Sequence, residues 1–223
     1  MSTFIYTPTK DKKENCLLYQ SNNDHDIFYQ EGNKNPLAKV YNKAIDFAIQ
    51  EDIEYLILTH DDVILENLDY EKLKRHFETY DVLGVAGASQ ITIQEPVLWH
   101  LMGGGFGSGN LHGAVAHLHN EKKSMTAFGP YPQQCLIMDG VFLAISRKVF
   151  KEVRFDEDCP SGFHMYDIDY TLSASLKGFK CGVIDNYITH ASPGLREFTE
   201  DWKEGQSWFL EKYKKYKGKV LKV

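Results

Sequence analysis

The segment from Tyr55 to Leu65 reads YLILTHDDVIL and places one histidine and two carboxylates inside an otherwise apolar run. A strand buried on both faces reads as a continuous apolar run, and an unpaired charge within it is costly. Either the strand ends at His60, or Asp61 and Asp62 have a cation as their partner.

A second acidic cluster, Asp167 and Asp169, precedes a helix expected over residues 170–176. Lys177-Gly178 is typical of a helix end. A strand is expected over 180–184, and His190 follows a further short apolar segment. Acids before a helix and a histidine after the next strand can converge on one end of a parallel sheet, where ligands of such folds bind.

The elements that must position these groups alternate along the chain. Apolar runs at 3–7, 55–59, 82–88 and 136–145 predict strands, and residues 37–49 have the three- and four-residue spacing of an amphipathic helix. Such alternation predicts one α/β, Rossmann-like domain over residues 1–223, with a mostly parallel central sheet flanked by helices.

Composition narrows the class of protein. Of the 223 residues, 43% are apolar, which is enough for a core, and the net charge of -6 argues against a general nucleic-acid binder. The four cysteines are widely spaced without a CxxC motif, which favours reduced thiols. We find neither a signal peptide nor an apolar stretch that could span a bilayer, and expect a cytoplasmic protein.

Residues 89–134 break the alternation and include the glycine-rich stretch GGGFGSGNLHG at 103–113. No Lys-Ser or Lys-Thr follows the glycines, so a phosphate-binding P-loop is not indicated. We interpret the segment as a long loop insertion that covers a binding site. Its histidines could bind a metal or lie in solvent, and the lack of accompanying carboxylates favours solvent: His112, His117 and His119.

A C-terminal helix is predicted over about residues 197–217, and it ends in a lysine-rich segment. Such a segment could make a weak contact with an anionic membrane surface, although charge runs more commonly serve solubility.

Four motifs together resemble a family 2 type glycosyltransferase of the GT-A fold, in particular its compact bacterial relatives. The similarity covers about residues 36–88 and 135–194. The motifs are THDDV at 59–63, MDGVFLAISRKVF at 138–150, FHMYDIDYTLSASLKGFKCGV at 163–183 and ITHASPG at 188–194.

The resemblance implies a divalent metal site. In that family an Asp-x-Asp element ends a core strand and binds the ion that carries the diphosphate of a nucleotide sugar. His60 and Asp62 match its two positions, and His190 resembles the distal histidine ligand. The imidazole at position 60 favours manganese over magnesium. Asp61 would reach the ribose or sugar of the donor. The alternative is that the two histidines are ordinary polar groups at strand ends.

The resemblance also implies the catalytic base. Glycosyl transfer needs a group that takes the proton of the acceptor hydroxyl. Asp167 matches the base of the family's Glu-Asp-x-Asp motif, Asp169 matches its acidic neighbour, and Tyr166 replaces the glutamate. A base acting opposite the leaving group gives inversion. The alternative for Asp167 is the favourable charge of a helix N-terminus.

Other positions match substrate contacts of that family. Lys39, Asn42 and Asp139 correspond to donor contacts, and His164 lies near enough in sequence to contact the acceptor. For Lys39 a solvated helix face is the alternative.

We therefore expect a metal-dependent glycosyltransferase that moves a sugar from a nucleotide-sugar donor to a carbohydrate or glycolipid acceptor, in surface polysaccharide or glycoconjugate synthesis. Two alternatives remain open. A sugar-phosphate nucleotidyltransferase would carry a basic glycine-rich loop near its N-terminus. A catalytically inactive nucleotide- or sugar-binding module would explain the departures at His60 and Tyr166.

Overall fold

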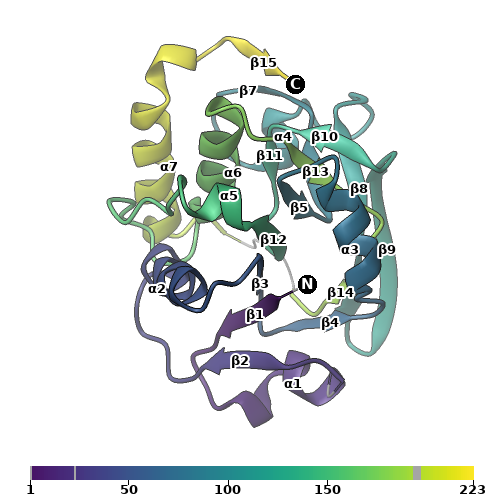
Figure 1. Ribbon diagram of the computed structural model, residues 1–223. Coiled ribbons are helices and arrows are strands. Elements are labelled where there is room, and N and C mark those ends of the chain that lie inside the picture. Colours follow the sequence, from purple (N-terminus) through teal and green to yellow (C-terminus); the bar gives the residue numbers. More distant parts are fainter. Residues whose placement is uncertain (1, 23, 193–196) are drawn as a thin grey trace.

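The central sheet of the computed structural model has seven strands, and five of them run in one direction (Figure 1). The model describes residues 2–22, 24–192 and 197–223. In spatial order the strands are β10 (Gln133–Cys135), β13 (Cys181–Val183), β5 (Val82–Gly84), β12 (Phe142–Ser146), β3 (Tyr55–Thr59), β1 (Thr3–Pro8) and β2 (Ile27–Gln30). The mostly parallel sheet predicted from the sequence is confirmed, and β12 and β10, which are antiparallel to their neighbours, make it a mixed sheet.

A second sheet packs beside the first and includes two long strands of the segment read as a loop insertion. Its order is β11 (Ile137–Met138), β6 (Ala86–Ala88), β8 (Leu111–His119), β14 (Ile188–His190) and β4 (Val63–Leu65), and β9 (Lys122–Gly129) pairs with β8. Residues 89–134 are therefore not one long loop. The longest stretch of this segment outside helices and strands is the glycine-rich turn between α4 (Trp99–Met102) and β8, and the role of this turn as a lid stays a prediction.

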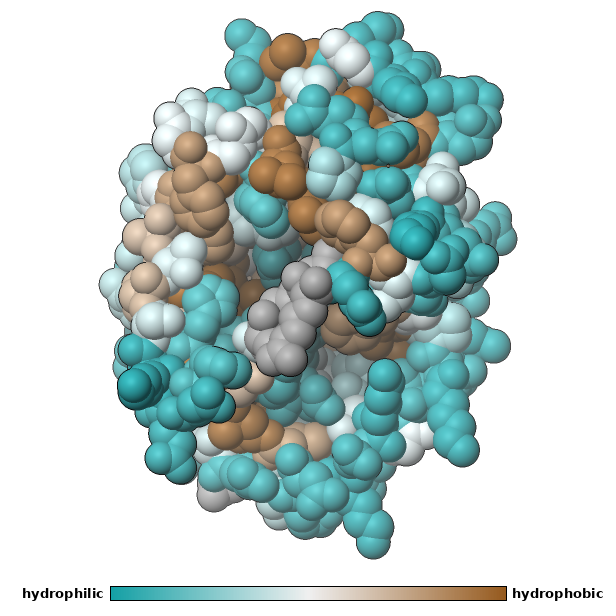
Figure 2. Space-filling model, turned by 180° about the vertical axis from the view of Figure 1, so that it is seen from behind, coloured by the Kyte–Doolittle hydropathy of each residue, from teal (hydrophilic) through white to brown (hydrophobic). Residues whose placement is uncertain are grey.

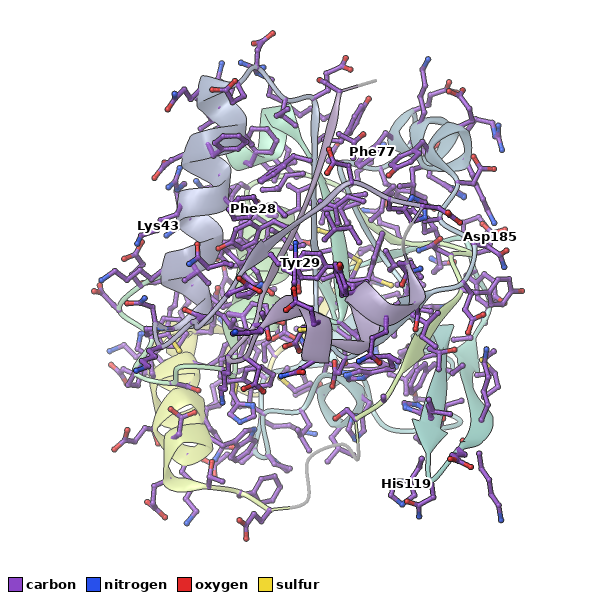
Figure 3. The ribbon with its side chains drawn as sticks, turned by 90° about the horizontal axis from the view of Figure 1, so that it is seen from below. Phe28, Tyr29, Lys43, Phe77, His119 and Asp185 are labelled. Atoms are coloured by element: carbon purple, nitrogen blue, oxygen red, sulfur yellow. The ribbon has the colours of Figure 1, made fainter. Side chains whose placement is uncertain are left out.

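The three histidines of that segment do not form a cluster. His112 is buried between the Pro130 carbonyl and the Ser89 hydroxyl, at 3.0 and 2.9 Å. His119 lies at the tip of the β8/β9 hairpin, across the molecule from Lys43 of helix α2 (Leu37–Gln50) (Figure 3). A metal site made of these three side chains is excluded by their separation along and across β8.

Two hydrophobic cores cover the two faces of the central sheet. Leu56 and Leu58 of β3 pack with α2 (Leu37–Gln50) in one core, whereas Ile57 packs in the other with α3 (Tyr70–Phe77). Alternate residues of a strand point to opposite faces, and a strand buried on both faces needs the continuous apolar run that β3 has. The remaining helices are α1 (Leu17–Ser21), α5 (Arg147–Phe150), α6 (Tyr166–Leu176), α7 (Glu200–Lys212) and the 3-10 turns η1 (Lys13–Asn15) and η2 (Lys214–Tyr216).

The C-terminal segment differs from the single helix predicted over 197–217. α7 ends at Lys212, and after η2 the chain forms β15 (Val220–Lys222), which pairs antiparallel with β7 (Gln90–Thr92). Several of the terminal lysines are exposed, and their contact with anionic lipid stays a prediction.

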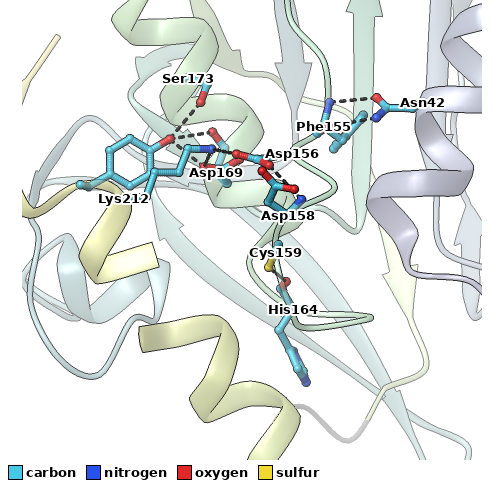
Figure 4. A network of polar contacts seen from close by, with 10 residues as sticks. Asn42, Phe155, Asp156, Asp158, Cys159, His164, Asp169, Ser173 and Lys212 are labelled. Atoms are coloured by element: carbon cyan, nitrogen blue, oxygen red, sulfur yellow. Dashed lines mark hydrogen bonds and ion pairs between the residues drawn. The ribbon is translucent and has the colours of Figure 1, made fainter. Parts of the chain in front are cut away.

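The Asp169 carboxylate links α6 to the C-terminal end of α7 (Figure 4). Asp169 lines neither of the two cavities described below. Its buried carboxylate accepts from the Tyr213 hydroxyl at 2.7 Å, and the Lys212 ammonium lies 2.7 Å from the same oxygen. Lys212 also donates to Asp156 at 2.6 Å. The sequence analysis did not anticipate this structural contact.

All four cysteines are buried and unpaired, as expected. Among the described residues, no helix is both long enough and apolar enough to cross a lipid bilayer.

The first prediction concerns the contact of Asp169 with Lys212 and Tyr213. Asp169→Asn keeps the acceptor for Tyr213 but removes the charge that faces Lys212, so the free energy of unfolding should fall by about 1–3 kcal/mol. Chemical denaturation measures the change. Asp24→Asn, which alters an exposed carboxylate, is the control. Unchanged stability in Asp169→Asn would contradict the role of Asp169 as a structural anchor.

Candidate active site

Three side chains converge at the end of β3 in a way that suits a cation. His190 Nε2 lies 3.2 Å from Asp62 Oδ1, and His60 Nδ1 lies 3.9 Å from the same oxygen. One potential ligand atom from each residue lies within 4.8 Å of the others. Among the described residues, no other group of three or more histidine, cysteine or carboxylate side chains meets this criterion.

Strand pairing explains the convergence. β14 is antiparallel to β4, and the register sets His190 opposite Val63, next to Asp62. The Ala191 amide then donates to the Asp62 carbonyl at 2.8 Å. His60 and Asp62 lie in the turn that joins β3 to β4, where the backbone leaves the central sheet. The strand thus ends at His60, and the carboxylates of the opening motif lie beyond the apolar run.

The electrostatics of the cluster favour a neutral imidazole at His60. Burial, followed by the neighbouring His190, lowers the pKa of His60. Burial acts to lower the pKa of His190 as well, but Asp62 and Asp139 outweigh it and raise that pKa. Burial acts to raise the pKa of Asp62, but the two imidazoles outweigh it and lower that pKa. An ionised carboxylate and a neutral imidazole are the forms that ligate metals.

One atom of the cluster lacks a hydrogen bond. Asp62 Oδ1 is buried, and no described residue donates to it with hydrogen-bond geometry, although His190 Nε2 is near. A buried carboxylate oxygen without a donor is costly unless a cation compensates it. Two imidazoles and one carboxylate fit manganese, and such a set is softer than magnesium prefers.

Tyr166 orients the His60 ring. Its hydroxyl donates to the Gly140 carbonyl at 3.3 Å and lies 2.8 Å from His60 Nε2. When the hydroxyl donates to the carbonyl, the phenolic oxygen accepts from Nε2–H, and the lone pair of the ring then lies on Nδ1, on the Asp62 side. In that tautomer Nδ1 can ligate an ion, and the contact with Tyr166 holds the ring in place.

Gly140 allows this close contact. A Cβ at that position would lie 2.3 Å from the Tyr166 hydroxyl oxygen and 2.6 Å from Asp167 Cβ. The N-cap residue of α6, Met165, is also unusual, because its backbone is left-handed with φ 68°. Strain at a non-glycine residue is typical of functional sites, where the surrounding structure holds it. α6 therefore begins at Tyr166, which is earlier than the sequence predicted.

Asp139 and Asp167 form a carboxylate pair beside this cluster. Asp167 Oδ2 accepts from the Gly140 amide at 2.9 Å, and Asp139 Oδ1 accepts from the Val141 amide at 3.0 Å. Burial, followed by the charge of Asp139, raises the pKa of Asp167 to about 7. A carboxyl group with a pKa near neutrality is suited to take up and release a proton.

Two hollows meet at the histidine and carboxylate groups. A cavity of about 520 Å³ is lined by Asp139, Asp167 and His164 together with aromatic side chains. A smaller hollow of about 110 Å³ contains Asp61 and Asp62. Both are lined by His60, Phe163, His190 and Ser192. Figure 2 shows the face opposite that of Figure 1, where hydrophobic residues lie around a hollow near the centre.

Two of the expected donor contacts lie elsewhere. Asn42 is buried, and both ends of its amide bind the Phe155 backbone, at 2.9 and 3.0 Å (Figure 4). Lys39 is exposed and lines neither hollow. It lies about 200° around α2 from Leu37, which does line the smaller hollow. The end of the ITHASPG motif, Pro193 and Gly194, lies outside the described residues.

Residues that the sequence analysis did not select complete the site. Trp99 donates its indole N–H to Asp139 Oδ2 at 3.0 Å, and His117 lines the larger cavity beside His190. Nothing in the sequence links Trp99 to Asp139, which lies forty residues away. His60 and Tyr166 did carry a signal, because both depart from the same family pattern, and the structure brings them into contact.

Comparison with known proteins gives the family. Two solved structures show weak similarity. A197 from STIV has 13% identity and a TM-score of 0.49 over 86% of this chain and 83% of its own. HddC from Yersinia pseudotuberculosis has 18% identity and a TM-score of 0.37 over 94% of this chain and 79% of its own. No curated protein sequence matches significantly. The model of a glycosyltransferase-like family matches residues 21–223, which is most of the chain, and the chain therefore belongs to this glycosyltransferase-like family.

Proposed function

We propose that the protein transfers a sugar from a nucleotide-sugar donor to a hydroxyl group of a carbohydrate or glycolipid acceptor, with a divalent metal bound by His60, Asp62 and His190. The observation that carries the proposal is the convergence of this cluster with the Asp139/Asp167 pair at two adjoining hollows. Membership of the glycosyltransferase-like family supports the reaction class. We further propose manganese as the metal and surface polysaccharide or glycoconjugate synthesis, in the cytoplasm, as the setting.

The two hollows divide the substrates. The smaller one contains Asp61 and Asp62 and lies between the ends of β1 and β3 and the start of α2, so we place the nucleoside part of the donor there. Asp61 then binds ribose or sugar hydroxyls. The larger cavity contains Asp167, and a base must contact the acceptor hydroxyl, so we place the acceptor there. His164 lines the same cavity.

The chemistry follows from this placement. The acceptor hydroxyl oxygen forms a bond to the anomeric carbon while the bond from that carbon to the diphosphate oxygen breaks. Its electron pair leaves with the nucleoside diphosphate, and the hydroxyl proton goes to Asp167. A bound divalent cation neutralises charge on the departing diphosphate. Because attack comes from the face opposite the leaving group, the anomeric configuration inverts.

A screen of nucleotide sugars tests the proposal directly. We expect one donor to bind in the presence of manganese and to be hydrolysed slowly or transferred to an added saccharide. Binding of manganese and nucleotide without any turnover would instead indicate an inactive binding module. Formation of a nucleotide sugar from a sugar phosphate and a nucleoside triphosphate would indicate a nucleotidyltransferase.

The metal cluster generates the second prediction. Asp62→Ala removes the only carboxylate of the cluster, so manganese-dependent binding of a nucleoside diphosphate should become undetectable by calorimetry. Glu204→Gln, which changes an exposed carboxylate of α7, should bind as the wild type does. Metal-dependent affinity that survives in Asp62→Ala would remove Asp62 from the site.

The contact between Tyr166 and His60 generates the third prediction. Tyr166→Phe deletes the hydroxyl that contacts His60 Nε2 and holds the ring, and loss of such a supporting contact typically weakens metal binding about 10- to 100-fold. Calorimetry of manganese-dependent nucleoside diphosphate binding measures the change in affinity. Tyr170→Phe is a matched control, because that hydroxyl lies in the same helix, is buried and has no hydrogen-bond partner among the described residues. Equal affinities in the two variants would contradict the positioning role of Tyr166.

The raised pKa of Asp167 generates the fourth prediction. Asp167→Asn keeps the shape and the bond from Gly140 but cannot take a proton, so turnover should fall about a hundredfold or more. In the wild type, turnover should increase as pH increases through about 7, where Asp167 loses its proton.

Stability should change in the opposite direction. An unfolded aspartate loses its proton near pH 3.8, whereas folded Asp167 keeps it to about pH 7, so the wild type loses stability between these values as pH increases. Asp167→Asn avoids this loss, and its melting temperature should exceed that of the wild type at pH 8 but not at pH 4. A lower melting temperature at pH 8 would favour the alternative that Asp167 stabilises the α6 N-terminus.

A further inference from the structure

Three aromatic side chains form an apolar wall of the larger cavity. It consists of Trp99 in α4, Phe106 in the glycine-rich turn and Phe128 in β9, and all three line the cavity. The Trp99 and Phe128 rings lie 4.8 Å apart edge to face, and the Phe106 and Phe128 rings are stacked at 5.6 Å. We use the term aromatic wall for these three residues.

The exposure of Phe106 is unusual for a large apolar side chain. It is 64% exposed, although Phe128 and the buried Trp99 lie behind it. The turn holds Phe106 in place through local bonds: Asn110 Nδ2 donates to the Gly103 carbonyl at 3.0 Å, and the Gly105 amide donates to the His100 carbonyl at 2.8 Å. An apolar ring displayed at the mouth of a cavity favours a ligand that covers it.

The wall is tied to the polar side of the cavity. Trp99 donates its indole N–H to Asp139 Oδ2 at 3.0 Å, and Asp139 lies beside Asp167. A ligand seated against the wall therefore meets carboxylates and imidazoles on its other side, including His100 and His164.

We propose that the aromatic wall binds a pyranose ring of the acceptor through the apolar face of the sugar. This inference rests on the proposed function and specifies the part of the acceptor that this cavity recognises. A pyranose presents C–H bonds on one face, which pack on the negative face of an aromatic ring. Its hydroxyls point outward, where Asp139, Asp167 and His164 can hydrogen-bond to them.

A lipid chain fits the cavity less well. It would cover the aromatic wall but offer no hydrogen bonds to the carboxylates and imidazoles that line the rest of the cavity. A nucleotide is disfavoured at this position because its phosphates would face the Asp139 and Asp167 charges. The sugar ring is the ligand class that satisfies both sides.

The test uses saturation-transfer NMR with methyl glycosides of glucose, galactose, mannose and N-acetylglucosamine, in both anomeric forms, added to the whole protein. We expect at least one glycoside to bind, with saturation strongest on the ring protons of one face. Phe106→Ala should reduce that signal at least fivefold, and Phe106→Tyr should retain it. Met125→Ala, an exposed β9 residue that does not line the cavity, is the matched control and should behave as the wild type.

Two results would overturn the inference. One is a glycoside signal that Phe106→Ala leaves unchanged in a variant with normal circular dichroism. The other is the absence of any glycoside signal at millimolar concentration. Binding of an octyl chain or a nucleoside diphosphate in the cavity, without any glycoside signal, would overturn the inference in the same way. The wild-type screen with manganese and nucleotide sugars is scored separately. A wall-dependent glycoside signal without donor binding would thus refute the transferase proposal and leave the sugar site standing.

Discussion

The antiparallel pairing of β12 with β3 is the constraint on which the site depends. The register pairs Phe142 with Thr59, and the His60 amide donates to the Val141 carbonyl at 3.3 Å. The start of β12 therefore meets the end of β3. Because β12 runs opposite to its neighbours, the residues before it lie at the same sheet edge as those after β3. Asp139 and Gly140 reach the histidine and carboxylate cluster for this reason alone.

At that edge a series of close contacts links the histidine cluster to Asp167. Gly140 has no side chain, so α6 can approach until its N-terminal residue contacts both the Gly140 carbonyl and His60. The same approach lets the Gly140 amide bind Asp167. Gly140 thus allows the contacts that hold Asp167, the candidate base, and, through Tyr166, those that hold the ring of His60, a candidate metal ligand. A side chain at position 140 would displace both.

Part of this arrangement was predictable from the sequence. The apolar run before His60 and the helix over 37–49 are local patterns, and the alternation of such elements was sufficient for the fold class. The resemblance to a glycosyltransferase family supplied His60, Asp62 and His190, which the structure brings together. The wrong inferences have a common cause. Residues 89–134 look irregular because three of their strands pair with partners far away in sequence, β7 with β15, β8 with β14 and β10 with β13, and such pairing leaves little local signal.

Asn42 and Asp169 illustrate the same limit at single residues. Both are polar groups in helices, at positions that match functional positions of the family. Asn42 instead bonds to the backbone of Phe155, and Asp169 forms an ion pair with Lys212. A buried polar group must be satisfied by something. Sequence position alone does not reveal whether that partner is a ligand or another segment of the protein.

In the proposed transferase, the charges around the two hollows explain why donor and cation would bind together. Asp61, Asp62, Asp139 and Asp167 all line them, whereas no lysine or arginine of the described part of the chain does. A diphosphate brought there alone would face carboxylates with only histidines as counter-charge, and burial holds His60 neutral. A divalent cation reverses the sign of the field at this point. The metal-free cluster would itself be a weak cation site with few ligands, and the diphosphate oxygens would complete it. Each partner thus supplies what the other lacks, so their binding free energies must be coupled.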